Sequence, residues 1–304
     1  MPAPLETELC GVKLRNPTVL ASGILDVSAD LMKRCVENGC AAVTTKSIGG
    51  EERTGWANPT VIELESGLLN AIGLSCPGYK SMEHEWEKLS KIDAPVIASV
   101  FGASVEEFVE VTEFLAQKKP DLFELNISCP NTKEHGMVFG VKCESAAEVV
   151  SAVKNVSGKI PVFAKVTPQA HNIAEIAKAC EEAGADGITA INTALGMAID
   201  IDARKPILYN KVGGLSGPAL KPIAIRCIYQ IYEKVNIPII ASGGISNGRD
   251  AIEAMMAGAS ATSIGSAIYY RGIDVFQKVC DEMEAWMKEN AVKNVKELIG
   301  AAHK

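Results

Sequence analysis

The sequence has no long uninterrupted hydrophobic run and no hydrophobic leader. A membrane-spanning helix needs about 20 consecutive apolar residues, and no segment of the 304 residues reaches that length. The first residues, MPAPLETELCGVKL, lack the basic stretch followed by an apolar one that a secretory signal would show. These absences predict a cytoplasmic protein without membrane association.

Regular spacings of metal-binding residues are missing as well. The nine cysteines include no C-x-x-C pair, and Cys35 and Cys40 have no further cysteine nearby to complete an iron–sulfur pattern. The four histidines are scattered and show no metal-ligand spacing. We therefore expect neither a metal nor a cluster on this chain.

Charge of one sign is not concentrated anywhere, and no stretch rich in proline, glycine or serine marks a linker. The formal net charge of −7 argues against nucleic acid and anionic membrane surfaces as partners. Barrels of roughly 250 residues commonly form one domain. We expect a single domain over residues 1–304.

What the sequence does contain is a regular alternation of short apolar runs and longer amphipathic segments. The expected strands are residues 18–21, 42–45, 96–100, 122–127, 162–166, 187–191, 237–241 and 260–264. Helical patterns between them include residues 29–37, 105–117, 146–156 and 173–183. Eight such repeats predict a closed (β/α)₈ TIM barrel. Long loops, residues 47–93 and 193–220, follow strands two and six, and such loops sit at the catalytic end.

Polar residues and glycines follow the apolar strands, at the end of the barrel where active sites are found. The polar ones are Ser22, Lys46, Ser47, Asn126, Lys165, Asn192 and Thr193. Gly243-Gly244 and Gly265-Ser266 follow strands seven and eight, where glycine lets backbone N–H groups approach a phosphate. Residues 213–217, also rich in glycine, could close the site.

Lys165 and Cys129 are the candidate chemical groups. Apolar neighbours indicate that Lys165 points into the barrel mouth, where it could form a Schiff base or stabilise a developing negative charge. Cys129 lies among polar residues after strand four, and nearby cations could make its thiol a general base. His135 is close enough in sequence to allow a Cys/His nucleophile pair instead.

Four segments carry a resemblance to a known family: residues 70–74 (NAIGL), 126–131 (NISCPN), 213–218 (GGLSGP) and 241–245 (ASGGI). Together they resemble the class 1 dihydroorotate dehydrogenases, and the similarity covers nearly the whole chain. Class 2 enzymes resemble this pattern but carry serine where Cys129 stands. The run of residues 128–134 is more similar to the class 1B catalytic subunit than to the fumarate-using class 1A.

The resemblance implies oxidation of (S)-dihydroorotate to orotate in de novo pyrimidine biosynthesis, the route to UMP. Cys129 would take the proton from C5, the N5 atom of one FMN per chain would take the hydride from C6, and Lys165 would stabilise the anionic reduced flavin. A homodimer within a heterotetramer is implied. Its second subunit would carry FAD and a [2Fe–2S] cluster and pass electrons to NAD⁺.

The site residues that the resemblance implies fall on the strand ends and the first long loop. The FMN contacts would be Ser22, Lys46, Ser47, Asn126, Lys165, Ile191, Gly217, Gly243, Gly244, Gly265 and Ser266. The substrate contacts would be Lys46, Asn70, Ala71, Ile72, Gly73, Leu74, Asn126, Asn131, Asn192 and Thr193. Ser99 stands where relatives have asparagine, which leaves a flavin contact there open.

Alternative functions stay open at this point. They are a class 1A enzyme that uses fumarate, another FMN-dependent pyrimidine reductase, an aldolase-type lyase with Lys165 as its Schiff base, and a subunit that binds flavin without catalysis.

Overall fold

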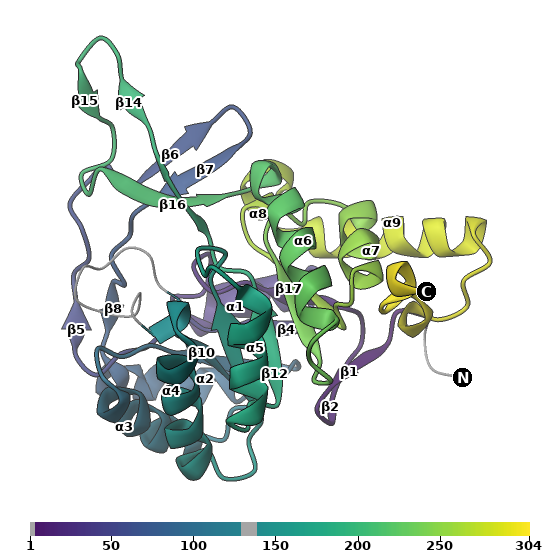
Figure 1. Cartoon of the computed structure of the whole chain (residues 1–304), viewed down its shortest axis with the longest axis horizontal. Coiled ribbons are helices and arrows are strands. Elements are labelled where there is room, and N and C mark those ends of the chain that lie inside the picture. The colour runs from purple at the N-terminus through teal and green to yellow at the C-terminus, as the bar shows by residue number, and fades with distance from the viewer. Residues whose placement is uncertain (1–3, 129–138) are drawn as a thin grey trace.

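The computed structural model describes residues 4–128 and 139–304, and its centre is a closed barrel of eight parallel strands (Figure 1). In chain order the barrel strands are β3 (Thr18–Leu20), β4 (Ala42–Thr44), β9 (Val96–Val100), β10 (Leu122–Asn126), β11 (Val162–Val166), β12 (Gly187–Ala190), β17 (Ile239–Ser242) and β18 (Ala261–Ile264). Each strand pairs with the next one of this series, and β18 closes the barrel on β3. The predicted TIM barrel is confirmed, and every predicted run overlaps its strand.

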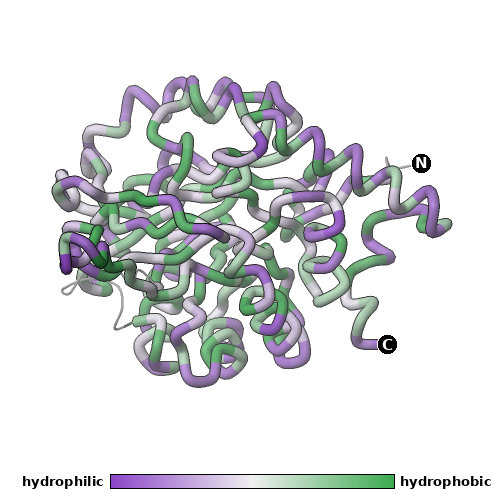
Figure 2. Tube along the Cα trace, turned by 90° about the horizontal axis from the view of Figure 1, so that it is seen from above, coloured by the Kyte–Doolittle hydropathy of each residue, from purple (hydrophilic) through white to green (hydrophobic). Residues whose placement is uncertain are grey.

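Amphipathic helices surround the barrel. They are α1 (Ala29–Glu37), α2 (Glu83–Leu89), α3 (Val105–Ala116), α4 (Cys143–Val156), α5 (Ile173–Glu182), α6 (Lys221–Tyr232), α7 (Gly248–Met256), α8 (Ala267–Arg271) and α9 (Val275–Glu289). Their outer turns alternate between hydrophilic and hydrophobic residues (Figure 2), and the buried faces pack on the strands. Among the described residues, no helix combines the length and the apolar character that crossing a membrane requires.

The barrel interior changes from apolar to polar along the strands. A buried apolar cluster includes Ala42, Ile97, Leu122, Phe163, Ile240 and Ala261. Side chains two residues apart share a face of a strand, so Glu124 follows Leu122 into the interior and Lys165 follows Phe163. The apolar layer therefore supports a polar layer nearer the carboxyl ends of the strands.

A short hairpin packs against the apolar end of the interior. It consists of β1 (Thr7–Leu9) and β2 (Val12–Leu14), which pair antiparallel. Leu9 and Leu14 are fully buried and belong to the same cluster as the interior residues. The hairpin thus shields this end of the barrel from water.

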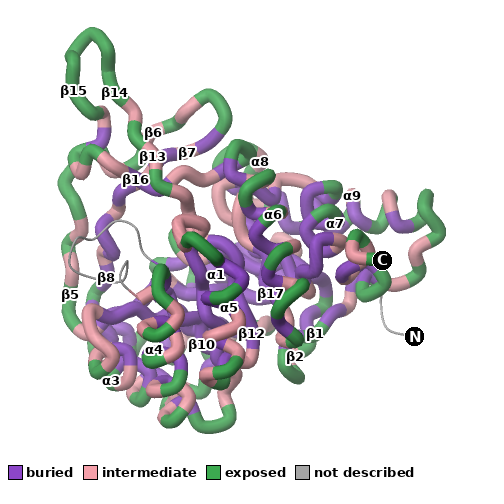
Figure 3. The backbone as a smooth tube through the Cα atoms, viewed as in Figure 1, coloured by how far each residue is buried: buried purple, intermediate pink, exposed green. Residues whose placement is uncertain are grey.

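The two long loops contain strands that pair with each other. β6 (Val61–Leu64) and β7 (Gly67–Asn70) come from the first loop, and β13 (Ala194–Met197) and β16 (Val212–Ser216) come from the second. They form an antiparallel sheet in the order β13-β16-β7-β6. Further short strands are β5 (Glu52–Arg53), β8 (Cys76–Pro77), β14 (Ile199–Asp200) and β15 (Lys205–Pro206). The β14–β15 hairpin projects from the body and is exposed (Figure 3).

The apolar interior layer should carry much of the stability. Phe163 is 1% exposed in this layer, whereas Ile201 on the projecting hairpin is 83% exposed. We expect Phe163→Ala to lower the free energy of unfolding by about 3–5 kcal/mol, because it leaves a cavity. Ile201→Ala, the control, should change it by less than about 0.5 kcal/mol. Urea denaturation measures both, and equal losses would contradict this account of the interior.

Candidate active site

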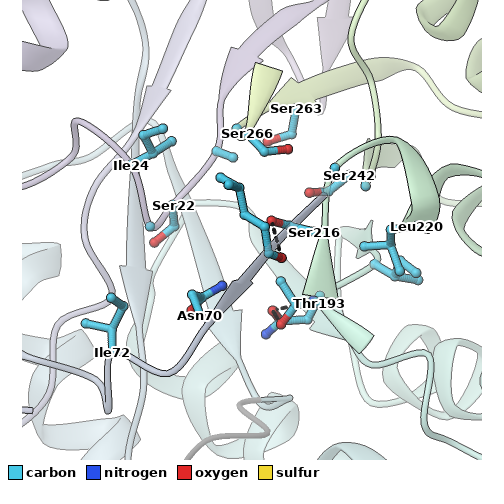
Figure 4. Close-up of a pocket in the computed structure, with 18 of the residues that line it drawn as sticks. Ser22, Ile24, Asn70, Ile72, Thr193, Ser216, Leu220, Ser242, Ser263 and Ser266 are labelled. Atoms are coloured by element: carbon cyan, nitrogen blue, oxygen red, sulfur yellow. Dashed lines mark hydrogen bonds between the residues drawn. The ribbon is translucent and has the colours of Figure 1, made fainter. Parts of the chain in front are cut away.

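A cavity of about 410 Å³ lies at the carboxyl ends of the barrel strands, beside the sheet formed by the two long loops. Its volume falls within the range of small-molecule sites, roughly 300–1,000 Å³. Figure 4 shows Ser22 and Asn70 on one side of the cavity and Ser242 and Leu220 on the other. Barrel strand ends and the loop sheet therefore both contribute to its wall.

The cavity brings together most of the site residues that the sequence suggested. Those lining it are Ser22, Lys46, Ser47, Asn70, Ile72, Gly73, Leu74, Asn126, Lys165, Ile191, Asn192, Thr193, Gly217, Gly243, Gly244, Gly265 and Ser266. Cys129 and Asn131 lie outside the described residues. The lining residues lie on or directly after strands β3, β4, β10, β11, β12, β17 and β18 and on the two loops, so closure of the barrel brings distant segments of the chain to one place.

Ala71 does not line the cavity, although its neighbours in the sequence do. Its side chain is buried with Leu69 and Leu208. Its backbone N–H donates to the Thr60 carbonyl at 2.7 Å. The carbonyl of Gly214, in the glycine-rich segment of the second loop, accepts a hydrogen bond from Asn70 Nδ2 at 3.2 Å and so helps to orient the Asn70 side chain.

Amide and hydroxyl groups on the floor of the cavity hold one another in place. Asn126 Nδ2 donates to Ser47 Oγ at 3.1 Å. Asn192 Nδ2 lies 3.2 Å from Asn126 Oδ1 and 3.0 Å from Ser128 Oγ, and donates to both. These bonds orient the amides before any ligand arrives, as a site for a hydrogen-bonding ring requires.

Lys165 forms a buried ion pair with Glu124, which reasoning from the sequence missed. The Lys165 Nζ and Glu124 Oε1 atoms are 3.1 Å apart, and the two side chains are 8% and 5% exposed. An ion-paired ammonium has no lone pair for attack on a carbonyl, so the geometry favours electrostatic stabilisation over a Schiff base. The signal was available: Glu124 is a lone acid in an apolar strand, two residues before Asn126.

Ser99 connects this ion pair to the cavity floor and does not line the cavity. Its hydroxyl lies 2.9 Å from Ser47 Oγ and 3.4 Å from Glu124 Oε1, and it is fully buried. The hydroxyl of Ser99 therefore bridges two neighbouring side chains.

Asp26 supports the loop after β3. Its carboxylate accepts hydrogen bonds from the Gly23 backbone N–H and the Ser22 hydroxyl. Burial raises the pKa of the Asp26 carboxyl, and the nearby Lys46 ammonium opposes that rise. Because Ser22 and Lys46 line the cavity, this buried acid fixes part of its rim.

The glycine turns after β17 have backbones that other residues would strain. Gly243 has φ of 121° and Gly244 has φ of 76°, and a Cβ on Gly244 would lie 2.6 Å from Lys221 Cβ. Gly265, after β18, would place a Cβ no closer than 3.4 Å to any neighbour, at Ala21. Such turns allow backbone N–H groups to approach an anion closely.

Several residues that line the cavity did not come from the sequence reasoning. They are Ala21, Ile24, Val61, Leu68, Leu220, Ser263 and Tyr269. Most are apolar or lie inside strands, and Val61 and Leu68 depend on the pairing of the two loops. Tyr269 also donates a hydrogen bond to Glu63 Oε2 at 3.0 Å, which joins α8 to the β6–β7 hairpin.

A parallel barrel with lysines, amides and glycine turns around a cavity at its strand ends defines an α/β-barrel enzyme with a site suited to a phosphate-bearing ligand. The family model described as dihydroorotate dehydrogenase matches residues 4–287. The chain belongs to this family of oxidoreductases.

Named relatives match this chain over almost its whole length. A protein of Pyrococcus abyssi is 48% identical over 99% of this chain and 99% of its own length. One of Methanocaldococcus jannaschii is 48% identical over 98% of each chain. Both are named dihydroorotate dehydrogenase B (NAD(+)), catalytic subunit.

The raised pKa of Asp26 predicts a stability that depends on pH. The neutral Asp26 carboxyl favours the folded protein. This contribution to stability is complete below pH 3.8, the ordinary value of the pKa, and is lost as pH rises from there through the raised pKa. Asp26→Asn removes that loss. Its free energy of unfolding relative to the wild type should therefore increase from acidic to neutral pH. Urea denaturation across this range tests the sign, with Asp202→Asn at an exposed aspartate as the control. A difference that shrinks with rising pH would contradict the burial argument.

Proposed function

We propose that this chain is the catalytic subunit of an NAD⁺-dependent dihydroorotate dehydrogenase, which oxidises (S)-dihydroorotate to orotate in de novo pyrimidine biosynthesis. One observation carries the proposal. This chain is 48% identical to such a subunit over almost its full length, and its cavity is lined by Lys46, Lys165 and the amides of Asn70, Asn126 and Asn192.

The residues present fit one FMN per chain, held by a single barrel domain of residues 1–304. Gly243, Gly244, Gly265 and Ser266 would hold the phosphate through backbone N–H groups. The other contacts proposed are Ser22, Lys46, Ser47, Asn126, Lys165, Ile191 and Gly217. When bound, FMN supplies the hydride acceptor that a dehydrogenase needs.

The substrate is a cyclic imide with a carboxylate, and the chain offers matching groups. Each asparagine amide provides a donor and an acceptor for the ring edge. The Lys46 ammonium and the backbone of residues 72–74 suit the carboxylate. The N–H of Ala71 already has the Thr60 carbonyl as its partner, so we assign the carboxylate to the residues that follow it.

The proton and the negative charge fall to different side chains. We assign to Cys129 the removal of the proton from C5 of the substrate, by its place in the NISCPN segment. Lys165, ion-paired with Glu124, lines the cavity as a cation that stabilises negative charge. Asn126 and Asn192 hold the substrate ring with amides that are already oriented. Thr193 and Asn131 complete the proposed substrate contacts.

The proposal extends to a partner. We infer a cytoplasmic heterotetramer built on a homodimer of this chain, with a second subunit that carries FAD and a [2Fe–2S] cluster and reduces NAD⁺. The relatives named as catalytic subunits support a partner of this kind.

An absorption spectrum of the purified chain, followed by anaerobic addition of dihydroorotate, tests the function. We expect a flavin spectrum with about one FMN per chain that bleaches on addition. A colourless protein that borohydride traps with a substrate would indicate a lyase instead. Reduction of a pyrimidine by NADPH would indicate a pyrimidine reductase. Reoxidation by NAD⁺ only with the partner subunit supports the class proposed, whereas direct reoxidation by fumarate would contradict it.

Cys129→Ala should separate cofactor binding from proton removal. We expect the variant to keep its FMN and to lose roughly 10²- to 10⁴-fold in turnover, the usual contribution of a general base. Cys10→Ala, at an exposed thiol, is the matched control and should turn over normally. A yellow Cys129→Ala protein with undiminished dihydroorotate oxidation would remove this thiol from the mechanism.

A further inference from the structure

We propose that Glu124 is a positioning residue, which holds the Lys165 ammonium in place and offsets its charge, and that the pair thereby sets the reduction potential of the flavin. This inference rests on the proposed function, because it requires FMN in the cavity.

The ion pair joins neighbouring strands in the polar layer of the barrel interior. Glu124 lies on β10 and pairs in register with Phe163 of β11, and Lys165 is two residues further along β11. Their charged atoms are 3.1 Å apart, with both side chains almost fully buried. Lys165 lines the cavity and Glu124 does not, so Glu124 acts on a bound group through Lys165.

A second bond fixes the carboxylate from the other side. The Ser99 hydroxyl on β9 lies 3.4 Å from Glu124 Oε1 and 2.9 Å from Ser47 Oγ. Ser47 in turn accepts from Asn126 Nδ2 at 3.1 Å. The carboxylate is thus anchored between three strands, which limits where the long Lys165 side chain can place its charge.

Few charges surround this pair. Of the described residues that line the cavity, only Lys46 and Lys165 are charged. Next to the pair, β9 contributes Ser99, and Thr189 of β12 lies in register with Lys165; neither residue carries a charge. The Asp26 carboxyl, on the loop after β3, interacts electrostatically with Lys46. A change of one charge at Glu124 should therefore alter the field in the cavity substantially.

The sign of the effect follows from the charges. A reduced flavin tends to be an anion, which a positive site favours. The Glu124 carboxylate offsets the positive charge of Lys165, because two opposite charges at this distance largely cancel at longer range. Removal of the acid should favour the reduced flavin, removal of the lysine should disfavour it, and removal of both charges should restore the balance.

The test is the midpoint potential of the bound FMN in three isosteric variants, measured by equilibration with a reference dye. At a fixed potential, Glu124→Gln should raise the ratio of reduced to oxidised flavin by about tenfold, which is about 30 mV for a two-electron couple. Lys165→Met should lower this ratio by a similar factor. The double variant should lie within about threefold of the wild type. Loss of structure alone would not move the two single variants in opposite directions.

Two further variants keep the test decisive. Ser99→Ala removes only the longer, 3.4 Å contact of the carboxylate and changes no charge; the 3.1 Å ion pair still holds Lys165, so the potential should stay close to that of the wild type. Glu124→Asp keeps the charge, so its midpoint potential should also stay close to that of the wild type. This variant provides the test if Glu124→Gln does not fold. A lowered or unchanged potential in Glu124→Gln, or a shift in Glu124→Asp as large as in Lys165→Met, would overturn the inference. Wild-type protein that binds no FMN would instead refute the proposed function.

Discussion

Closure of eight parallel strands is the constraint on which the rest of the structure depends. A closed barrel sends alternate residues of every strand into one interior, so the apolar Leu122 and Phe163 lie beneath the polar Glu124 and Lys165. The apolar layer excludes water, and it thereby strengthens the electrostatic interactions in the layer above. The position of the cavity follows directly, because in the described part of the chain the polar layer of the barrel interior lies toward the carboxyl ends of the strands, above the apolar layer.

The polar layer works as one connected unit rather than as a set of separate contacts. The ion pair of Lys165 continues through the hydroxyls of Ser99 and Ser47 to the amides of Asn126 and Asn192. A network of this kind has a cost if any member is left without a partner, and that cost keeps the geometry fixed. The same network brings the groups proposed for the cofactor and those proposed for the substrate into one rigid frame.

Much of the fold could be predicted from the sequence because hydrophobic periodicity and turn residues are local signals. All eight barrel strands and the first turns of helices such as α1 follow them, with Ser28 accepting from Leu31 N–H at the start of that helix. The sheet that joins the two long loops could not be predicted, since its strands pair across more than a hundred residues, as Leu69 does with Leu215. Glu124 was missed for a related reason. Within a strand expected to be buried on both faces, its partner on another strand is invisible to local reasoning.

The most direct test of the central claim is a crystal structure of the chain with FMN and orotate bound. The account predicts both molecules in the one cavity at the carboxyl ends of the barrel strands, with the phosphate at Gly243–Gly244 and Gly265 and the flavin ring next to Lys165. Electron density for FMN at any other place, or a Lys165 side chain that points away from the flavin, would contradict it.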